Sequence, residues 1–179
     1  MITNVISDVV KFIDKHKSIV SKPQSELGLF SFENANYSNY TTIINKEYLL
    51  SAEKIPTTFF QEQLIKSYEV RVFYFYGKCY SMAIFSQLDS QTSVDFRHYN
   101  NKNPNRNVPY ELKKELQDKI KKLMETLGLD TGSLDFVKTI DGRLVFLEVN
   151  PVGQFGMVSF PCNYYIEQII ADHLIKENK

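Results

Sequence analysis

The sequence predicts an α+β fold, because strand pairs that turn back on themselves alternate with amphipathic helices. Residues 133–151 contain two apolar runs joined by Asp141-Gly142, a dipeptide that favours a two-residue hairpin turn. Residues 69–85 form a second expected hairpin, which turns through Gly77-Lys78. Apolar residues recur at helical spacing in residues 2–16 and 109–127. We therefore expect antiparallel sheet covered by helices.

Composition indicates a globular protein with balanced charge. The 179 residues are 43% hydrophobic, which suffices for one ordinary domain or two small lobes with a buried core. Lys plus Arg and Asp plus Glu both number 21, so no net field attracts nucleic acid or an anionic membrane. The amino-terminal apolar residues are interrupted by Lys11 and Asp14, which excludes a signal peptide or membrane span there. Cys79 and Cys162 have neither metal nor disulfide spacing, which fits a reducing cytoplasm.

The amino-terminal part is expected to hold short strands around a flap. After the first helix, residues 18–20 predict a strand that stops at Lys22-Pro23, because proline lacks the N–H that a strand ladder needs. Residues 24–39 are polar and predict a mobile flap, which leads into an extended run over residues 40–45. A short helix at 46–53 and a strand at 57–65 complete this part, and Gln61-Glu62 interrupts the apolar run of that strand.

The second hairpin and the loop after it carry charged residues. On a two-residue Gly77-Lys78 loop, Glu69 and Arg71 share one face of their strand with Phe73. Residues 88–108 lack periodicity and predict a long loop, and long ordered loops in compact domains are often functional.

The carboxyl-terminal half is expected to contain two helices. The first begins near Pro109 and ends at Gly128, and we expect it to cover the sheet that bears the hairpin at residues 133–151. Its apolar stripe consists of Leu112, Leu116, Ile120, Leu123 and Leu127. Residues 152–161 are expected to be irregular, and Asn163 to cap a last helix.

Three oxygen-bearing side chains of the hairpin at residues 133–151 form a candidate metal site. A two-residue turn pairs Ile140 with Arg143, Phe136 with Leu147 and Asp135 with Glu148, and Asn150 shares a face with Glu148. Opposed like charges among apolar neighbours destabilise a sheet, so we expect a cation between the carboxylates. Such oxygen ligands suit Mg²⁺, whose remaining ligands are usually phosphates and water. The alternative is that the carboxylates are solvated or paired with Lys or Arg.

The order of these motifs resembles that of the ATP-grasp ligases. The motifs are Lys22-Pro23, Phe60-Gln61-Glu62, Tyr68-Glu69-Val70-Arg71, Phe96-Arg97, Leu134-Asp135-Phe136, Asp141-Gly142 and Leu147-Glu148-Val149-Asn150-Pro151. The resemblance covers nearly the whole chain and is strongest to the grasp-with-spasm peptide maturases, relatives of the microviridin-type ligases. It implies two lobes of antiparallel sheet that grip ATP, here residues 1–66 and 67–179. The usual amino-terminal domain of the family does not precede Lys22, so we expect a split or truncated ligase that a separate chain would complete.

The resemblance also implies roles for individual residues. The implied cofactor-binding residues are Lys22 at the ATP phosphates, Gln61 and Glu62 at the adenine-binding hinge, and Glu69. The implied Mg²⁺ ligands are Asp135, Glu148 and Asn150. Arg71 and Arg97 would contact the acyl phosphate or the acceptor carboxylate, which suits the guanidinium fork. The alternative is that each arginine pairs locally, Arg71 with Glu69 and Arg97 with Asp95.

These expectations together predict an ATP- and Mg²⁺-dependent carboxylate ligase. Such an enzyme converts a carboxylate into an acyl phosphate, which a hydroxyl or an amine then attacks to give an ester or an amide. As the family implies, the carboxylate would belong to an Asp or Glu side chain of a ribosomally made precursor peptide, and the attacking group to Ser, Thr or Lys. Two alternatives are a ligase that adds amino acids to a protein or small carboxylate, and a nucleotide- or peptide-binding module without turnover. From the residues alone, only nucleotide-dependent group transfer is indicated.

Overall fold

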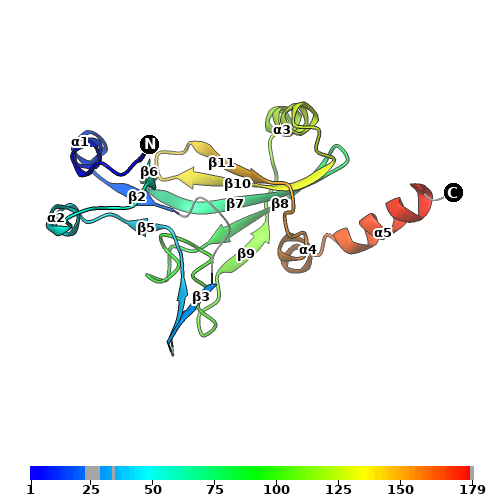
Figure 1. Ribbon diagram of the computed structural model, residues 1–179. Helices are drawn as coiled ribbons and strands as arrows, with labels where there is room; N and C mark the ends of the chain where they lie inside the picture. Colours follow the sequence, from blue (N-terminus) through cyan, green and yellow to red (C-terminus); the bar gives the residue numbers. More distant parts are fainter. Residues whose placement is uncertain (23–28, 34, 178–179) are drawn as a thin grey trace. The chain divides into compact units, whose positions relative to one another are not determined.

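The protein divides into two compact units in a computed structural model that describes residues 1–22, 29–33 and 35–177 (Figure 1). The first unit contains Met1–Ile65 and Leu88–Pro104, and the second contains Lys66–Gln87 and Asn105–Lys179. Residues 88–104 of the predicted long loop therefore belong to the first unit, although they are flanked by strands of the second. The prediction of a loop is wrong for residues 106–108, which lie in a strand of the second unit. Within the described residues, no helix is long and apolar enough to cross a membrane.

The first unit is built on a four-stranded antiparallel sheet. Its strands are β1 (Ile2–Thr3), β2 (Ile19–Ser21), β5 (Thr42–Ile43) and β6 (Thr58–Glu62), in the spatial order β1-β6-β2-β5. Helices α1 (Ile6–His16) and α2 (Lys46–Ser51) pack on this sheet, and their apolar residues form a core with it. That core consists of Val9, Ile13, Ile19, Leu49 and Phe60. The predicted first helix is thus confirmed from Ile6 onward, and its expected first residues form β1 instead.

The predicted flap contains a strand pair. Strands β3 (Leu29–Phe32) and β4 (Ala35–Ser38) pair antiparallel with each other, so the prediction of a loop is wrong for these residues. The aromatic residues Phe30, Phe32 and Tyr37 favour strands, and no proline interrupts either segment. Pro23 and residues 24–28 and 34 lie outside the described residues.

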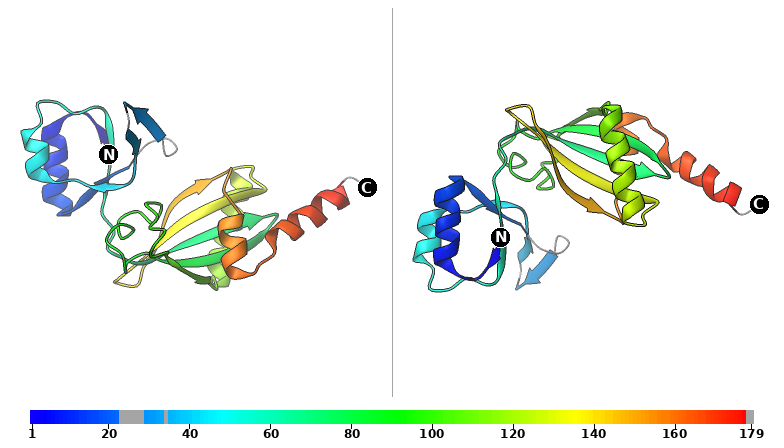
Figure 2. Two further views of the ribbon diagram at one scale, coloured as in Figure 1. Left: turned by 90° about the horizontal axis from the view of Figure 1, so that it is seen from below. Right: turned by 90° about the horizontal axis from the view of Figure 1, so that it is seen from above.

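The second unit contains a five-stranded antiparallel sheet with helices on both faces. Its strands are β7 (Lys66–Phe75), β8 (Lys78–Phe85), β9 (Arg106–Pro109), β10 (Thr131–Thr139) and β11 (Leu144–Asn150), in the order β11-β10-β7-β8-β9. Helix α3 (Lys114–Thr126) lies against one face of this sheet, and α4 (Gly156–Cys162) lies against the other (Figure 2). One face of the sheet is therefore covered by α3 and the other by α4.

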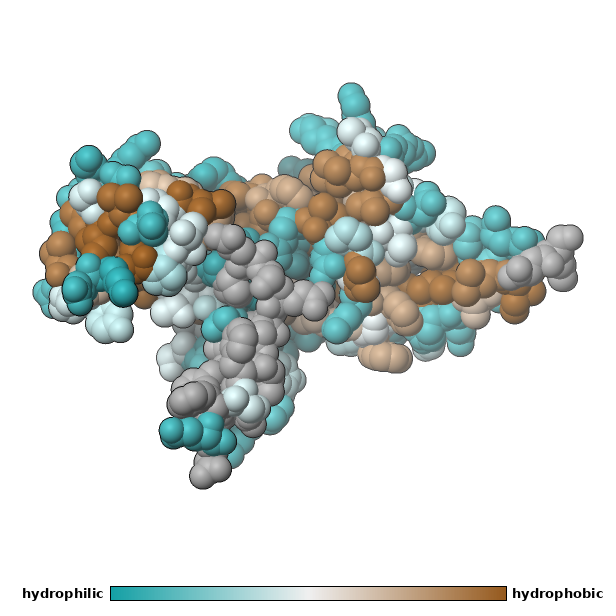
Figure 3. All heavy atoms as spheres, viewed as in Figure 1, coloured by the Kyte–Doolittle hydropathy of each residue, from teal (hydrophilic) through white to brown (hydrophobic). Residues whose placement is uncertain are grey.

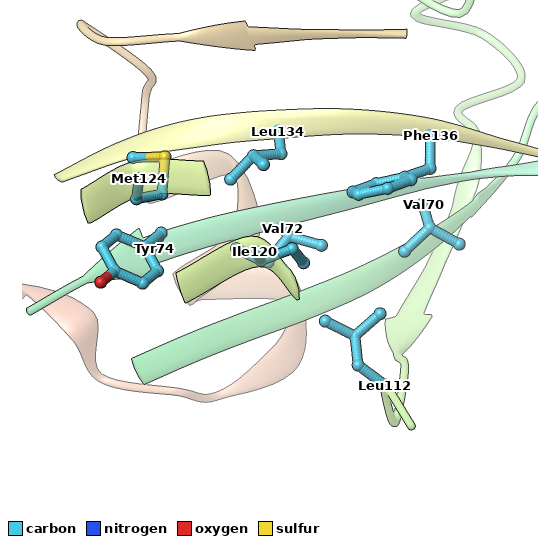
Figure 4. Close-up of a cluster of buried hydrophobic side chains, with 8 residues drawn as sticks. All are labelled: Val70, Val72, Tyr74, Leu112, Ile120, Met124, Leu134 and Phe136. Atoms are coloured by element: carbon cyan, nitrogen blue, oxygen red, sulfur yellow. The ribbon is translucent and has the colours of Figure 1, made fainter. Parts of the chain in front are cut away.

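The core of the second unit lies between α3 and the sheet. Eight buried side chains form it, and Figure 4 shows them pointing into the space between the helix and the strands: Val70, Val72, Tyr74, Leu112, Ile120, Met124, Leu134 and Phe136. Leu116 and Leu123 pack against this cluster, which confirms that the helix covers the predicted hairpin. The helix begins later than predicted, because Pro109 is the last residue of β9 and pairs with Met82. A proline is tolerated there because β9 is an edge strand.

The hairpin between β7 and β8 turns one residue earlier than predicted. Its two loop residues are Tyr76 (φ 42°) and Gly77 (φ 85°), and Phe75 pairs with Lys78. Two consecutive positive φ angles are typical of a type I′ turn, whose twist matches the flanking strands. Arg71 consequently pairs with Met82, whereas a two-residue Gly77-Lys78 loop would place it opposite Ile84. A register difference of two residues leaves every side chain on its predicted face.

The hairpin between β10 and β11 keeps the predicted pairing at the site and changes it near the turn. Its loop has three residues, Ile140 to Gly142, and Gly142 has a φ of 89°. The register shifts between Asp135 and Phe136, where Phe136 pairs with Phe146 and not with Leu147. This bulge on β11 compensates for the longer loop, because each displaces the pairing by one residue in opposite directions. Asp135 therefore still lies opposite Glu148.

The end of the chain is more helical than predicted. Helix α4 occupies part of the stretch that we expected to be irregular, and α5 (Ile166–Glu177) follows it. Asn163 terminates α4 with a φ of 53°, and the N-terminus of α5 is capped by Ser159, whose Oγ accepts a hydrogen bond from the Ile166 N–H at 2.9 Å. Asn163 is therefore not the cap of α5. Exposed Leu174 and Ile175 contribute to an apolar stripe along α5 (Figure 3).

Candidate functional site

The predicted site residues of the second unit lie on the face of its sheet that α3 does not cover. Val70, Val72 and Leu134 point toward α3, so their neighbours in sequence point to the opposite face. Contacts with α4 and with the residue before it confirm this arrangement, because Arg71 contacts Met157 of α4 and the ring of Phe73 lies 5.9 Å from that of Phe155. The predicted site residues on this face are Arg71, Asp135, Glu148 and Asn150.

Asp135, Glu148 and Asn150 come together on neighbouring strands. Asp135 of β10 pairs with Glu148 of β11, and Asn150 lies two residues further along β11, on the same face. Asp135 is half-buried, whereas Glu148 and Asn150 are exposed. The Asn150 Oδ1 accepts a hydrogen bond from the Val152 N–H at 2.9 Å, which orients the amide at the start of the connection to α4. Their role as metal ligands remains a prediction.

The donor set fits a magnesium ion that is shared with a nucleotide. The described residues contain no group of three His, Cys, Asp or Glu side chains placed to hold a metal. A cation here would thus be held by two carboxylates and the second lone pair of the Asn150 carbonyl. Mg²⁺ is commonly held by one or two carboxylates together with substrate phosphates and water. The opposed carboxylates of Asp135 and Glu148 also repel each other, which a bound cation would relieve.

Arg71 lies beside Asp135 with a buried guanidinium. Arg71 Nε is 3.8 Å from Asp135 Oδ1, and the Arg71 side chain is 11% exposed. One terminal nitrogen of Arg71 contacts the Met157 sulfur at 3.6 Å, while Nε, although buried, has no hydrogen-bond partner among the described residues. A buried N–H without an acceptor is costly, so this position favours an incoming anionic oxygen. The alternative pairing of Arg71 with Glu69 is wrong.

Glu69 pairs instead with Lys66 and Ser86. The Lys66 ammonium donates to Glu69 Oε1, and the Ser86 hydroxyl donates to Oε2 at 2.7 Å. Glu69 is 6% exposed. Burial raises the pKa of Glu69, and Lys66 and Ser86 offset this only in part. Both carboxylate oxygens have partners within the chain, so any contribution of Glu69 to cofactor binding would act through Lys66.

In the first unit, Lys22 and Gln61 lie on the sheet face opposite α1. Phe60 of β6 points into the core with α1, so Phe59 and Gln61 point the other way. Lys22 directly follows β2, as predicted, and its ammonium lies 5.7 Å from the centre of the Phe59 ring. A cation over an aromatic face is attracted by the ring quadrupole. Phe59 thus helps to fix Lys22 on the face that carries Gln61.

Glu62 does not share this face. It alternates with Gln61 and lies 3.3 Å from His16 Nδ1 of α1. A ligand on the Lys22 face would therefore meet the side chain of Gln61 but not that of Glu62. Both residues end β6, and only residues 63–65 separate them from Lys66, the first residue of β7 and of the second unit. This position fits the predicted hinge between lobes.

Arg97 pairs with Asp95, which is the local alternative that the sequence left open. Arg97 Nε and Nη2 donate to the two carboxylate oxygens of Asp95 at 2.9 and 2.7 Å. Burial alone would raise the pKa of Asp95, but hydrogen bonds from Arg97 and from the Thr41 N–H, with the charge of Arg97, lower it to about 2. The pair is therefore ionic at neutral pH. It does not exclude a further contact of Arg97 with a substrate, because guanidinium groups have five N–H donors.

Sequence reasoning did not single out Lys66 and Phe59, which contact the predicted site residues Glu69 and Lys22. Lys66 follows the expected strand at residues 57–65 and carries no motif signal, and only its burial beside Glu69 marks it. Phe59 reads as an ordinary strand residue, and its contact with Lys22 depends on the pairing of β2 with β6. The spacing of Lys66 and Glu69 could have suggested a pair, but three residues along a strand put side chains on opposite faces.

Comparison with known proteins identifies relatives by structure. Neither a family model nor a curated protein matches the sequence. The macrocyclase MdnC from Microcystis aeruginosa MRC, bound with precursor peptide MdnA, is 27% identical with a TM-score of 0.78, over 98% of this chain and 53% of that chain. An ATP-grasp ligase from Chryseobacterium gregarium is associated with ribosomally made, modified peptides (RiPPs), and its structure contains ADP and a leader and core peptide. It is 23% identical with a TM-score of 0.76, over 87% of this chain and 47% of that chain.

A third solved structure is similar to this chain and has the same fold. The ATP-grasp ligase PsnB, complexed with a phosphomimetic variant of a minimal precursor, Mg and ADP, is 22% identical with a TM-score of 0.73, over 100% of this chain and 52% of that chain. This chain thus spans about half the length of the solved structures that it matches. The chain has the ATP-grasp fold and is similar to the RiPP-associated members of that ligase family.

Proposed function

We propose that the chain carries the nucleotide and metal site of an ATP- and Mg²⁺-dependent ligase that modifies a precursor peptide. The observation that carries this proposal is the face of the second unit on which Asp135 opposes Glu148. Arg71 lies beside them, and its buried Nε has no hydrogen-bond acceptor in the described part of the chain. Oxygen ligands and a guanidinium on one face suit a phosphoryl group and its cation. The relatives' structures, which contain ADP, Mg or precursor peptides, support the same reaction class.

The reaction proposed is the joining of a carboxylate to a hydroxyl or an amine. The terminal phosphoryl group of ATP passes to a carboxylate oxygen, which gives an acyl phosphate and ADP. The hydroxyl or amine then attacks the carbonyl carbon, phosphate leaves, and an ester or amide remains. Phosphoryl transfer of this kind depends mainly on positioning and electrostatic stabilisation, and no covalent protein intermediate is required.

The residues of the chain have separate tasks in this scheme. Asp135, Glu148 and Asn150 would hold Mg²⁺, which when bound neutralises charge on the phosphates. Arg71 would donate from its buried Nε to an oxygen of the transferring phosphoryl group or of the acyl phosphate. Lys22, fixed by Phe59, would bind the ATP phosphates.

The substrate and the cellular location are proposed on narrower grounds. A precursor peptide as substrate rests on the peptides present in the relatives' structures. A cytoplasmic location fits the use of ATP and the free thiols of Cys79 and Cys162.

Calorimetric titration with ATP in the presence of Mg²⁺, followed by an ADP-release assay with candidate peptides, tests this function. Peptides that contain acidic residues together with Ser, Thr or Lys should trigger ADP release and lose one water per bond formed, as measured by mass spectrometry. Binding of ATP without ADP release would instead support a module without turnover. ADP release with free amino acids but not with peptides would support a ligase of the amino-acid-adding type. No ATP binding at all would overturn the proposal.

The Lys22→Ala variant locates the nucleotide in the same titration. Removing the ammonium should weaken ATP binding at least about tenfold, because a charge-assisted contact to phosphate is lost. Lys11→Ala is the matched control, since Lys11 lies exposed on α1 and should leave the affinity unchanged. Equal affinity of the wild type and Lys22→Ala would remove Lys22 from the site.

A further inference from the structure

We propose that Asp95 is a positioning residue that holds the guanidinium of Arg97 ready to bind an anionic reactant, either a carboxylate or a phosphoryl group. The inference rests on the proposed function and deepens it, because it assigns a specific task to the long loop at residues 88–104 of the first unit. Asp95 itself would not touch the reactant.

The contact between the two residues fixes the plane of the guanidinium. Both Asp95 oxygens accept from Arg97, Oδ1 from Nε at 2.9 Å and Oδ2 from Nη2 at 2.7 Å. The Arg97 backbone N–H also donates to Asp95 Oδ1 at 3.0 Å. A two-point contact between planar groups leaves little rotational freedom, unlike a single ion pair. The contact with Asp95 therefore fixes the orientation of the Arg97 guanidinium.

The burial of the pair is unequal. The Asp95 side chain is 5% exposed and that of Arg97 is 35% exposed. The carboxylate lies inside the unit, and the guanidinium extends from it toward solvent. Asp95 engages two of the five N–H donors of the guanidinium, and the 35% exposure of the Arg97 side chain lets a dissolved anion approach it. A planar group with parallel N–H donors suits carboxylate and phosphoryl oxygens.

Asp95 is in turn anchored to the body of the first unit. Its Oδ2 accepts from the Thr41 N–H at 3.0 Å, and Thr41 directly precedes β5 of the sheet. The rings of Tyr40 and His98 stack at 4.4 Å, which adds a second link between the same two segments. Asp95 therefore holds Arg97 at a fixed position relative to the sheet of the first unit. An arginine on a long loop acquires in this way the fixed geometry that binding of a reacting group requires.

The alternative is that Asp95 only neutralises the charge of a surface arginine. The two roles predict opposite changes in anion affinity when Asp95 is replaced. If Asp95 only cancels charge, its neutral amide replacement leaves a more positive site that binds anions more tightly. If Asp95 positions Arg97, the same replacement releases the guanidinium and weakens anion binding, because the ordering must then be achieved on binding.

The test uses the whole chain with inorganic phosphate as the probe and nitrogen NMR of arginine side chains as the readout. In the wild type, the Arg97 Nε–H signal, identified by its loss in Arg97→Lys, should exchange slowly and move on addition of phosphate. In Asp95→Asn the signal should lose its protection, and the dissociation constant for phosphate should rise about tenfold. Asp89→Asn is the matched control, because Asp89 holds the same loop through Gln91 and Asn100. It should leave both readouts unchanged.

A double variant separates positioning from loss of loop structure. Arg97→Lys keeps the charge but cannot make the two-point contact, so it should weaken phosphate binding as much as Asp95→Asn does. Combining the two changes should add little, because one interaction has been removed twice. Phosphate binding in Asp95→Asn that equals or exceeds that of the wild type would overturn the inference. A wild type that shows these phosphate effects but forms no ADP would overturn the proposed function and leave this inference standing.

Discussion

Asp135 and Glu148 show how two residues can be unfavourable for folding and useful for a site. They occupy opposed positions on β10 and β11, where like charges repel. Arg71 compensates only in part, because its Nε is 3.8 Å from Asp135, beyond ordinary hydrogen-bond length. Two carboxylates and a guanidinium arranged in this way favour the binding of a cation and an anion together.

Replacement Glu148→Gln tests this view. It should lower Mg²⁺-dependent ADP formation at least about 100-fold, because a charged metal ligand is lost. The same change should leave the fold intact and raise the free energy of unfolding by about 0.5 kcal/mol, since it removes a cross-strand repulsion. Steady-state kinetics and urea unfolding measure the two effects. Glu125→Gln on the exposed side of α3 is the control, and normal activity of Glu148→Gln would show that the metal assignment is wrong.

Asp95 should make the protein sensitive to acid. Its pKa is about 2 in the folded protein, against an ordinary value of 3.8 for an aspartate, so folding is favoured while the group is ionised. This contribution is about 2 kcal/mol at neutral pH, falls to about half near pH 3 and is lost as the pH passes below 2. Urea unfolding of the wild type and Asp95→Asn between pH 7 and 2.5 measures it. The difference between the two proteins should shrink with acid, and a constant difference would contradict the ionic pairing.

At the scale of elements, the β10–β11 hairpin and the connection from Asn150 to α4 position the predicted metal ligands. The bulge at Leu147 restores the pairing of Asp135 with Glu148 that the three-residue turn would otherwise displace. After Asn150 the chain must pass close to β10 before it enters α4. Gly153 lies so near Ser133 that an added Cβ would be 2.2 Å from Ser133 Oγ and 2.4 Å from Ser133 N. The absence of a side chain is what permits this approach.

Replacement Gly153→Ala should therefore destabilise the second unit. Overpacking against buried backbone costs about 2–3 kcal/mol, which lowers Tm by about 5 °C or more. Gly156→Ala is the control, because its Cβ would meet only the exposed, movable ring of Phe160. Adding Ser133→Ala should not rescue the Gly153 variant, since the backbone nitrogen would still clash. Differential scanning calorimetry compares the Tm values of the variants. An unchanged Tm of Gly153→Ala would show that the connection between Asn150 and α4 moves to accommodate the added Cβ.

At the scale of the whole molecule, the candidate residues are divided between two units of one chain. Lys22, Gln61 and Arg97 belong to the first unit, and Arg71 and the metal-binding candidates belong to the second. A ligand that binds the folded protein and not the unfolded chain stabilises the folded form by mass action. The Mg²⁺–ATP complex at about 100 times its dissociation constant should add about 2.7 kcal/mol.

Thermal unfolding with and without Mg²⁺–ATP checks this expectation. Tm should rise by several degrees with both ligands and by much less with ATP and a chelator, because the carboxylates alone repel the phosphates. Glu148→Gln should show a smaller rise with Mg²⁺ than the wild type. An equal rise with and without the chelator would indicate nucleotide binding that does not involve the metal.

The sequence by itself determined the strands of the two hairpins, the main helices and the opposition of Asp135 to Glu148. These follow from local rules: alternation along strands, helical spacing of Leu112 to Leu123, and turn residues at the hairpins. Even where both turns were misplaced, an even register difference at one hairpin and a compensating bulge at the other preserved the faces. The resemblance of the motif order to that of the ATP-grasp ligases also implied the fold, which the structural comparisons bear out.

Only the tertiary structure decided which charges meet. Glu69 accepts hydrogen bonds from Lys66 and Ser86. Arg71 lies beside Asp135, and Glu62 lies beside His16. The loop at residues 88–104 joined the first unit through Asp95 and Thr41. Local patterns fix the face on which a side chain lies, but a charged group's partner depends on burial and on strands or helices that are distant in sequence. The physical reason is that the energy of an ion pair is set by distance and surroundings in three dimensions, which no spacing along the chain encodes.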